Sequence, residues 1–333
     1  MVTANAAKRL VQHYVDNFRR LPWRSPPGEP APDAYRVWLS EIMLQQTTVA
    51  AITPRFKRFV ARWPTIEALA AARDEDVLQE WAGLGYYARA RNLIACARRV
   101  AGVGGFPRTA AQLRMLPGVG DYTAGAIAAI AFGEATPAVD TNVTRVIARL
   151  NGLEQPNRLE IQRLMSDMMP VDRPGDFVQA LMDLGATICR PKAPRCESCP
   201  LTEDCGARAT GKPEAFPVRR PRAARLVKHG IAWWIERSGH VWLVRRPARG
   251  MLGGMVALPG TEWTEDSQSA PTGPARVRHI FTHFELELQV VRKAQAVGVG
   301  WWQPLDRLDQ AGLPTLYRKV AAAMLDSEQR RAA

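Results

Sequence analysis

The sequence predicts two domains, a mainly α-helical domain over residues 1–211 and a smaller α+β domain over residues 230–328, joined by a basic linker at residues 212–229. Three observations predict this division. The chain has 333 residues, which is more than one compact core usually takes. Alanine-rich stretches with helical periodicity fill the first part. Alternating apolar and polar residues, typical of strands, appear only after the linker.

The expected helices of the first domain are separated by short glycine or proline breaks, such as those in AGLGYY and LPGVG. The chain is expected to begin with a short amphipathic helix that places Leu10, Val11, Tyr14 and Val15 on one side. Six further helices are expected at residues 33–48, 66–81, 88–100, 110–115, 123–132 and 142–150.

The stretch GARATGKPEAFPVRRPRAARLVKH has many basic residues and prolines and little periodicity, which is typical of a linker. Beyond it, the runs IAWWIE and HVWLVRR flank Ser238 and Gly239 and predict a β-hairpin. A longer alternating run at residues 277–291 predicts further strand structure, and residues 314–325 predict a closing helix.

The charge balance points to a polyanionic partner. Lys and Arg number 45 against 32 Asp and Glu, for a formal net charge of +13. Nucleic acid is the simplest such partner, although a proteome rich in arginine would give the same balance. No apolar run is long enough to cross a bilayer, and the N-terminal residues lack a signal-peptide core. We therefore expect a soluble, intracellular protein without a membrane partner.

Four of the five cysteines lie close together, with the spacing Cys189-x6-Cys196-x2-Cys199-x5-Cys205. In an intracellular protein, clustered cysteines more often bind metal than form disulfides. A structural zinc site usually pairs two C-x-x-C knuckles, and only one occurs here. The spacing therefore favours an iron–sulfur cluster, with zinc as the rival. Cys96 lies among apolar residues of an expected helix and is predicted to be an inert buried thiol.

This cysteine spacing resembles the 4Fe-4S loop of the endonuclease III superfamily of DNA glycosylases. The resemblance implies a structural cluster, held by the four cysteines, that organises a loop against DNA. Three basic residues of the loop, Arg190, Lys192 and Arg195, would offset the negative charge of the cluster and are placed to meet phosphates.

The run LPGVGDYTAGA predicts a tight turn that leads into a helix. Glycines let the backbone turn sharply and approach a partner closely. The N–H groups of Gly118, Val119 and Gly120 are therefore expected to face a DNA phosphate at the helix N-terminus. A plain helical hairpin without a ligand is the alternative. The run resembles the helix-hairpin-helix of the same superfamily, here at about residues 112–126.

In the run PAVDTNVTRVIARL, Asp140 stands where the N-cap of an amphipathic helix belongs. The simplest interpretation is a structural cap. However, a carboxylate held beside a helix N-terminus keeps its charge, and a sugar that becomes oxocarbenium-like needs such a charge. The pattern is similar to the catalytic aspartate motif of the superfamily, which implies that Asp140 is catalytic and that Asn142 orients it.

Bifunctional members of the superfamily carry a lysine at the sixth position after the leucine of LPGVG, where this chain has Tyr122. No lysine lies in the hairpin, and a Schiff base requires an amine. Strong strand cleavage is therefore not expected. Water, or a transient ester with Asp140, would capture the sugar, and Tyr122 would pack near it.

The run DAYRVWLSEIMLQQT resembles the signature of adenine DNA glycosylases, the MutY family, with Glu41 as the catalytic acid. A carboxylic acid beside apolar neighbours such as Trp38 and Ile42 tends to have a raised pKa, so it can stay protonated near neutrality and protonate a leaving base. A solvated glutamate on a polar helix face is the alternative.

The same resemblance implies several substrate-binding residues. Gln45 and Gln46 would fill the space left by an extruded base, residues 84–86 would wedge into the duplex, and Trp23, Arg24 and Asp183 would form the adenine pocket. These residues are Trp23, Arg24, Leu44, Gln45, Gln46, Leu84, Tyr86 and Asp183. The eight-residue segment PPGEPAPD is longer than is usual in the family. Because of this extra length, the resemblance fixes the position of Arg24 less exactly.

The run RPARGMLGGMVALPG resembles the opening of a Nudix (MutT-like) domain. The glutamates that bind Mg²⁺ in Nudix hydrolases are missing from the run TEWTEDSQSAPT, so this domain is expected to bind rather than hydrolyse. The run HIFTHFELELQV resembles the Phe-Ser-His element that meets oxidised guanine in the family, here Phe281, Thr282 and His283. An ordinary strand with an incidental histidine is the alternative.

The resemblance covers about residues 10–325 and implies a mainly α helix-hairpin-helix glycosylase with a 4Fe-4S loop, followed by a C-terminal α+β MutT/Nudix-like domain. The implied activity is monofunctional excision of adenine mispaired with 8-oxoguanine or guanine in double-stranded DNA, by a monomer associated with the bacterial nucleoid. The alternatives are a bifunctional pyrimidine-lesion glycosylase with lyase activity, a DNA-binding or redox protein that carries a cluster, and a nucleotide pyrophosphatase.

Overall fold

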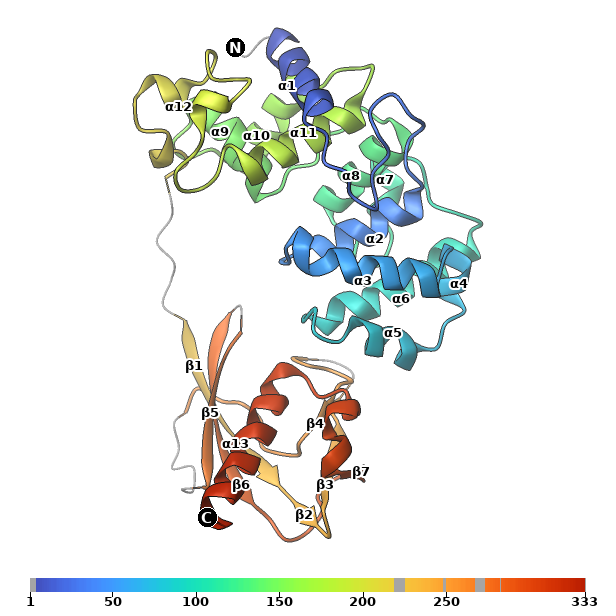
Figure 1. Ribbon diagram of the computed structural model, residues 1–333, viewed down its shortest axis with the longest axis vertical. Coiled ribbons are helices and arrows are strands. Elements are labelled where there is room, and N and C mark those ends of the chain that lie inside the picture. The colour runs from blue at the N-terminus through green and yellow to red at the C-terminus, as the bar shows by residue number, and fades with distance from the viewer. Residues whose placement is uncertain (1–3, 219–224, 248–249, 267–272, 282, 333) are drawn as a thin grey trace. The chain divides into compact units, whose positions relative to one another are not determined.

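The computed structural model describes residues 4–218, 225–247, 250–266, 273–281 and 283–332. The chain divides into two compact units. One comprises residues 1–74 and 91–220, and the other comprises residues 75–90 and 221–333. Figure 1 shows that helices make up the chain before residue 218 and that strands appear only after it. No helix in the described part of the chain is both long and apolar enough to cross a membrane.

The helical part of the chain contains twelve helices among its described residues, together with short 3-10 turns at Cys196–Ser198 and Pro213–Ala215. The helices are α1 (Ala4–Asp16), α2 (Ala34–Leu44), α3 (Val49–Arg62), α4 (Ile66–Ala70), α5 (Asp74–Trp81), α6 (Tyr87–Gly102), α7 (Ala110–Leu113), α8 (Asp121–Phe132), α9 (Thr141–Leu150), α10 (Arg158–Met168), α11 (Pro174–Thr187) and α12 (Gly206–Ala209).

Several helices begin at a side chain that accepts a hydrogen bond from the first turn. Asp33 accepts from the N–H of Arg36 at the start of α2, and Thr48 accepts from Ala51 at the start of α3. Such caps satisfy backbone donors that have no partner within the helix. Because Thr48 caps the start of α3, α2 ends before Thr48.

The structure differs from the expected helices in two respects. The single helix expected at residues 66–81 is two helices, α4 and α5, because the turn at residues 71–73 separates them. Helices α3, α10, α11 and α12 lie outside the expected stretches. Helix α3 buries Ile52, Phe56 and Phe59 at helical spacing, so its pattern was present in the sequence, although Pro54 inside it reads as a break.

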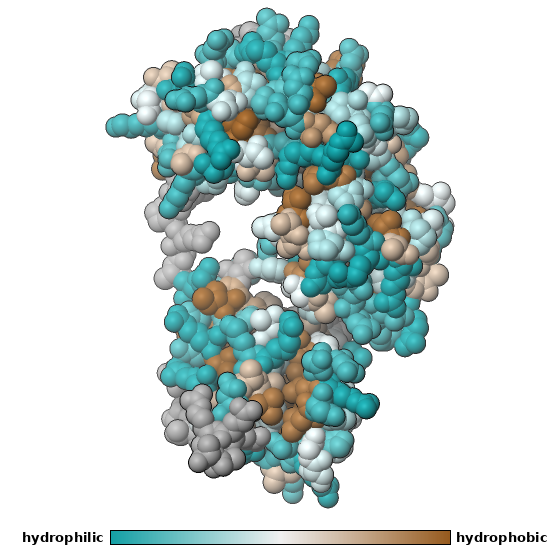
Figure 2. Space-filling view, in the orientation of Figure 1, coloured by the Kyte–Doolittle hydropathy of each residue, from teal (hydrophilic) through white to brown (hydrophobic). Residues whose placement is uncertain are grey.

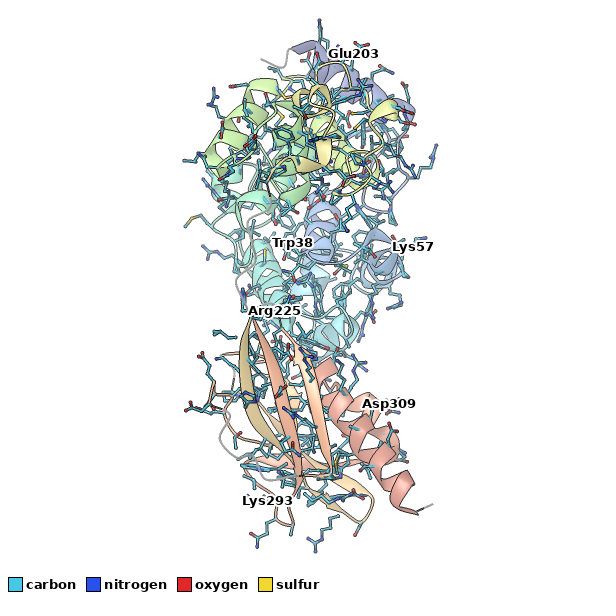
Figure 3. The ribbon with its side chains drawn as sticks, turned by 90° about the vertical axis from the view of Figure 1, so that its left-hand side faces the viewer. Trp38, Lys57, Glu203, Arg225, Lys293 and Asp309 are labelled. Carbon is cyan, nitrogen blue, oxygen red and sulfur yellow. The ribbon has the colours of Figure 1, made fainter. Side chains whose placement is uncertain are left out.

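The core of the first unit is built around α2 and α8, which pack against each other, and α8 also packs against α11. Trp38 of α2 has no exposed surface and lies inside the unit, whereas Lys57 points outward (Figure 3). Two glycines allow segments of this unit to approach each other closely. A Cβ built on Gly125 of α8 would lie 2.4 Å from the carbonyl oxygen of Pro137, and one on Gly185 of α11 would lie 2.8 Å from Cβ of Asn142.

The second unit contains two sheets, a 3-10 segment at Leu305–Ala311 and the helix α13 (Thr315–Ala332). In the first sheet β1 (Leu226–Trp234) pairs in parallel with β6 (Phe284–Arg292), and β6 pairs antiparallel with β5 (Ala275–Ile280). In the second sheet β3 pairs antiparallel with three strands. The strands of this second sheet are β2 (Glu236–Arg237), β3 (His240–Arg245), β4 (Val256–Ala257) and β7 (Gly300–Pro304).

A hydrophobic core lies between these sheets and α13 and includes Trp234, Leu286 and Met324. The predicted hairpin at Ser238 and Gly239 is present as the β2–β3 pair, but β1 itself joins the other sheet. The alternating run at residues 277–291 is two strands, because the chain turns between Phe281 and Phe284. Hydrophilic residues occupy most of the visible surface of the chain, as expected from its charge (Figure 2).

Candidate active site

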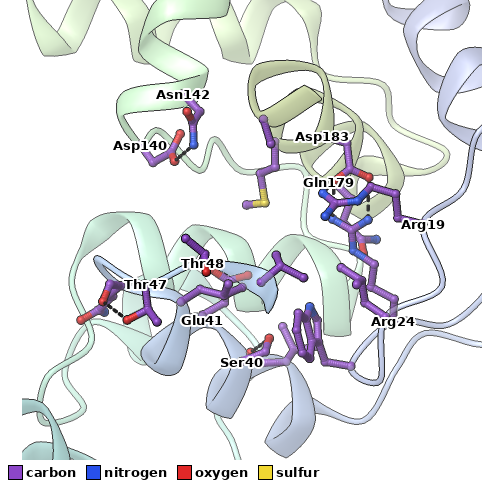
Figure 4. Close-up of a pocket in the computed structure, with 18 of the residues that line it drawn as sticks. Arg19, Arg24, Ser40, Glu41, Thr47, Thr48, Asp140, Asn142, Gln179 and Asp183 are labelled. Carbon is purple, nitrogen blue, oxygen red and sulfur yellow. Dashed lines mark hydrogen bonds and ion pairs between the residues drawn. The ribbon is translucent and has the colours of Figure 1, made fainter. Parts of the chain in front are cut away.

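The largest cavity described in the first unit has a volume of about 1020 Å³ and lies where the segment before α2, α2 itself, the N-terminus of α9, and α11 meet. Figure 4 shows Asp140 and Asn142 on one side of this pocket, Glu41 on another, and Arg19, Arg24 and Asp183 grouped at a third. Ten of the predicted site residues line it. These are Trp23, Arg24, Glu41, Leu44, Gln45, Gln46, Tyr122, Asp140, Asn142 and Asp183.

Glu41 is a buried carboxyl group on the pocket-facing side of α2. Its residue is only 5% exposed, and its Oε2 accepts a hydrogen bond of 2.8 Å from the hydroxyl of Tyr122. The pKa of Glu41 is raised to about 7, chiefly by burial and in smaller part by the negative charge of Asp140. The hydrogen bond from Tyr122 and the charge of Arg24 oppose this rise in pKa. Glu41 can therefore carry or release a proton near neutral pH.

Asp140 is fixed at the N-cap of α9. Its Oδ1 accepts a hydrogen bond of 2.7 Å from the N–H of Val143, and its Oδ2 accepts one of 3.1 Å from Nδ2 of Asn142. Asn142 is held in turn by Arg145, whose guanidinium donates to Oδ1 of Asn142 at 2.9 Å and to the carbonyl of Gly185 at 2.7 Å. Hydrogen bonds to the ionised form and the helix dipole both stabilise a negative charge at this position.

Arg24 and Asp183 form a nearly buried ion pair at the opposite end of the pocket. Two nitrogens of Arg24 contact the two carboxylate oxygens of Asp183 at 2.6 and 3.0 Å, and their side chains are 7% and 14% exposed. Arg19 adds a contact of 2.8 Å to the same carboxylate. Burial by itself lowers the pKa of Arg24, but hydrogen bonds and charge attraction from Asp183 outweigh it, and the net pKa is raised. Arg24 therefore remains charged here.

The apolar and amide residues of the pocket complete its walls. Trp23 is 5% exposed and packs edge-on against Phe56, with ring centroids 5.1 Å apart. Gln45 is the C-cap of α2, and its side-chain amide lies 3.5 Å from the hydroxyl of Thr123. Gln46 takes a left-handed backbone conformation with φ of 61°, which turns the chain sharply out of α2.

Thirteen of the residues that line the pocket were not predicted as site residues from the sequence. Arg19, Ser40, Gln179 and Met182 all line the pocket, and Gln179 is only 5% exposed. Gln179 and Asp183 are four residues apart on α11 and so share one helix face. That spacing was visible in the sequence and is the signal that could have identified Gln179. Nothing local distinguished Arg19, because its partner Asp183 is 164 residues away.

Leu84 and Tyr86 do not line this pocket. They belong to residues 82–86, a turn that follows α5, in which Trp81 donates a hydrogen bond of 3.0 Å to the carbonyl of Gly85. Leu84 is 8% exposed, whereas Tyr86 is 52% exposed and has a positive φ of 46°. Tyr86 is therefore the predicted wedge residue that solvent can reach.

The glycine turn before α8 borders a second cavity, of about 650 Å³, which also reaches Tyr122 and Asp140. Gly118 and Gly120 line this cavity, and no hydrogen bond from either N–H occurs among the described residues. The N–H of Val119 instead donates to the carbonyl of Leu116 at 3.2 Å, and the Val119 residue is 6% exposed. The turn thus offers two of its three predicted donors.

The four cysteines of the 189–205 loop line one small cavity of about 30 Å³, and none forms a disulfide. No group of three His, Cys, Asp or Glu side chains among the described residues is placed to hold a metal ion. The pKa of the Cys199 thiol is raised to about 11, chiefly by burial and in smaller part by the other three cysteines. The thiols surround a hollow without converging on one point.

The buried side chain of Arg149 connects the start of the cysteine loop with Phe216, which lies beyond the end of the loop. It is 2% exposed and donates to the carbonyls of Phe216 at 2.9 Å, Arg190 at 2.7 Å and Pro191 at 3.2 Å. One of its nitrogens lies 3.5 Å from Sγ of Cys189. Cys96, as predicted, is a fully buried thiol, and burial raises its pKa to about 12.

In the second unit, the chain turns between β5 and β6 through a hydrogen bond of 2.9 Å from Phe281 N–H to the carbonyl of Phe284. The ring of Phe281 stacks on Trp263 at 5.6 Å and lies 4.8 Å from the Phe284 ring. His283 is exposed, and Thr282 lies outside the described residues. Phe281 is thus an anchor of the turn, while His283 is available to a partner.

Two family models match this chain in regions that agree with its architecture. The model described as HhH-GPD superfamily base excision DNA repair protein matches residues 39–170. The model described as NUDIX domain matches residues 231–323. Together with the solved structures described below, these matches confirm the predicted fold class, a helix-hairpin-helix helical part followed by an α+β Nudix-like domain.

Curated relatives decide the family. An adenine DNA glycosylase of Mus musculus is 35% identical over 400 residues, which cover 96% of this chain and 78% of that protein. The chain belongs to the adenine DNA glycosylase family. Another member, from Arabidopsis thaliana, is 39% identical over 306 residues, which cover 78% of this chain and 48% of that protein. The alignment with the human member covers 65% of that protein, so this chain spans about half of the first of these two relatives and just under two thirds of the second.

Solved structures of other glycosylases share the fold of the helical part. A thermostable thymine-DNA glycosylase superimposes with a TM-score of 0.56 and 28% identity, covering 61% of this chain and 95% of that one. A trapped endonuclease III–DNA covalent intermediate superimposes with a TM-score of 0.54 and 25% identity, covering 63% of this chain and 99% of that one. The adenine DNA glycosylase family therefore shares its helical architecture with glycosylases of other substrates.

Proposed function

We propose that this chain is a monofunctional DNA glycosylase that removes adenine mispaired with 8-oxoguanine or guanine in double-stranded DNA, as part of base excision repair. The proposal extends family membership to a particular substrate and to particular residues. The observation that supports it best is that Glu41 and Asp140 line one pocket together with the buried Arg24–Asp183 pair. Two acidic groups with different environments suit one acid and one fixed charge.

In this mechanism Glu41 is the general acid. With a pKa of about 7, it is protonated in a large fraction of molecules at physiological pH and can donate a proton to a ring nitrogen of an extruded adenine. Protonation makes the base a better leaving group. Tyr122 keeps the carboxyl group oriented through its 2.8 Å hydrogen bond.

Asp140 stabilises the sugar as the glycosidic bond breaks. The hydrogen bonds from Val143 and Asn142 hold both carboxylate oxygens in place, so the negative charge is positioned before the reaction begins. Preorganised charge of this kind lowers the energy of an oxocarbenium-like transition state without reorganisation. Water, or a transient ester with Asp140, then captures the sugar.

Adenine recognition falls to the opposite end of the pocket. Trp23 supplies an apolar wall, and the Arg24–Asp183 pair borders the space for the base. Gln45 and Gln46, which also line the cavity, would fill the space that the extruded base leaves in the duplex. Strong lyase activity is not expected, because Tyr122 stands at the sequence position where bifunctional relatives carry the attacking lysine, and its hydroxyl is engaged with Glu41.

We propose that Cys189, Cys196, Cys199 and Cys205 hold a 4Fe-4S cluster. The hollow lined by all four thiols and the buried Arg149 beside it support this proposal. A single zinc ion holds its four ligands about 2.3 Å away, which calls for sulfurs that converge on one point. The cluster would supply a rigid crosslink of the loop, and the glycosidic step uses only side chains of the pocket.

We propose that residues 1–211 carry the glycosylase activity, with Tyr86 and Leu84 opening the duplex. Residues 230–328 would read the base opposite adenine through the turn at residues 281–283, and residues 212–229 would link the two domains. The exposure of His283 and the anchoring of Phe281 in an aromatic cluster support a recognition role for this turn. We further propose that the chain acts as a monomer on DNA in the bacterial nucleoid.

The decisive experiment is single-turnover base release from duplexes that carry adenine opposite 8-oxoguanine, guanine or thymine. Adenine should be released from the first two and not from the third. Glu41→Gln should slow release by about 100-fold to 10,000-fold. Asp140→Asn should slow it by at least about 100-fold, although asparagine still caps α9.

Glu29→Gln, at an exposed position, is the control and should release adenine at the unaltered rate. Release of a pyrimidine lesion with efficient borohydride trapping would favour the bifunctional alternative, and full activity of Glu41→Gln would exclude Glu41 as the acid.

A further inference from the structure

Asp121 joins two arginines at the edge of the cavity that borders the glycine turn. Its Oδ1 lies 3.2 Å from a nitrogen of Arg114, and its Oδ2 lies 2.6 Å from a nitrogen of Arg158. Arg114 is the C-cap of α7, Asp121 opens α8, and Arg158 opens α10. Three elements that are separate in the sequence are thereby connected through one carboxylate.

The three side chains are accessible to a partner. Their side-chain exposures are 53% for Arg114, 43% for Asp121 and 57% for Arg158. The triad of Arg114, Asp121 and Arg158 carries a net charge of +1. Each guanidinium has five N–H donors, and the single carboxylate can accept hydrogen bonds from only some of them. Asp121 and Arg158 line the same 650 Å³ cavity as Gly118 and Gly120.

We propose that Arg114 and Arg158 form a binding site for a DNA backbone phosphate and that Asp121 is a competitor for that site within the chain. This inference rests on the proposed action on DNA. A carboxylate between two guanidiniums occupies the place that a phosphate oxygen pair would take, because both anions accept bidentate hydrogen bonds from arginine. When DNA binds, the arginines exchange the Asp121 carboxylate for a phosphate.

This exchange of the Asp121 carboxylate for a phosphate determines how tightly the chain binds DNA, whatever the DNA sequence. An exposed ion pair contributes little to stability, so Asp121 can be displaced at small cost. The carboxylate nevertheless stays beside the phosphate and repels it, which weakens attachment to undamaged DNA. The bound phosphate also faces the unpaired N–H groups of Gly118 and Gly120, which are suitable donors to a phosphate oxygen.

The test measures the dissociation constant of the full-length chain for an undamaged duplex at several salt concentrations. Arg158→Gln and Arg114→Gln should each weaken binding and reduce the salt slope by about one, as expected for the loss of one phosphate contact. Asp121→Asn should tighten binding several-fold.

The chain supplies a matched control, the exposed pair Arg163–Asp167 on α10, which lines none of the described cavities and has a nitrogen–oxygen distance of 3.6 Å. Arg163→Gln and Asp167→Asn change the net charge identically but should leave the affinity and the salt slope nearly unchanged. The proposal is overturned if the Asp121 and Asp167 variants bind alike, or if Arg158→Gln keeps the salt slope. Because the duplex is undamaged, this result does not depend on whether adenine is released, and an enzyme that binds as expected but releases no adenine would contradict only the proposed activity.

Discussion

The hydroxyl of Tyr122 donates a hydrogen bond of 2.8 Å to Oε2 of Glu41, and this contact sets the pH at which the acid works. The bond favours the charged carboxylate and so opposes the effect of burial, and the net pKa of Glu41 is about 7. Tyr122→Phe should therefore raise the pKa of Glu41, and the descending limb of the rate–pH profile should move to higher pH. Single-turnover rates between pH 5 and 9 would measure this shift, and an unmoved limb would show that Glu41 does not govern it.

Glu41 should lower the stability of the protein at neutral pH. Its pKa in the folded state is about 7, above the value of 4.5 for an unperturbed group, so the folded state binds the proton more tightly. The stability supplied by this proton is present below pH 4.5 and is lost as the pH rises toward 7, at a cost of about 3 kcal/mol. Glu41→Gln should thus raise the melting temperature at pH 8 and change it little at pH 5. An equal effect at both pH values would contradict the assigned cause.

The ion pair between Arg24 and Asp183 should matter more for stability than pairs on the surface. Asp183→Asn leaves Arg24 buried without its charge partner, which should lower the free energy of unfolding by about 3 kcal/mol or more. Asp176→Asn on the same helix removes the partner of the half-exposed Arg173 and should cost about 1 kcal/mol or less. Urea unfolding of the two variants would compare these costs. Similar losses would mean that the Arg24 pair is screened by solvent.

Gly125 should tolerate no side chain, because a Cβ there would meet the carbonyl oxygen of Pro137 at 2.4 Å, three residues before Asp140. Gly125→Ala should lower the free energy of unfolding by about 1–3 kcal/mol and slow adenine release by displacing Asp140. The control is Gly102→Ala at the end of α6, where no atom lies within 4 Å, and this variant should be as stable as the parent or more so. Thermal melting and base-release rates would separate the two outcomes.

Arg149 should be needed for the cysteine loop to bind its proposed iron–sulfur cluster. Lysine has one charged group and cannot replace the hydrogen bonds from Arg149 to Phe216, Arg190 and Pro191. Arg149→Lys should lower both the iron bound per chain and the resistance of the loop to proteolysis, whereas Arg163→Lys on the surface should change neither. A fully loaded, resistant Arg149→Lys variant would show that the loop does not depend on this side chain.

The helical pattern and the short motifs could be predicted from the sequence, because each depends on neighbouring residues. Asp140 was expected at a helix cap and is found as a cap. Local spacing placed Glu41 near Trp38 and Ile42 on one helix but left open whether it is solvated, and in the structure it is buried. Element boundaries were less certain, as the division of residues 66–81 into α4 and α5 illustrates.

Contacts between distant segments could not be predicted. Tyr122 and Glu41 are 81 residues apart, and Arg24 and Asp183 are 159 apart, so no local pattern relates them. The pairing of β1 with β6 could not be predicted for the same reason. The run that contains β1 was expected only as one arm of a hairpin. Long-range pairing depends on the path of the whole chain, which periodicity does not describe.

Asp140 is held by α9, away from the Arg24–Asp183 pair. The proposed stabilisation of the sugar and the proposed recognition of the base therefore fall to different parts of one cavity. The charge that serves the sugar is secured by its own helix, while the surfaces that would contact a base come from the segment before α2 and from α11. Substrate choice could therefore drift through changes at Arg19, Arg24, Gln179 or Asp183 without disturbing bond breakage. Laboratory evolution toward a different nucleobase has its natural starting points at these four positions.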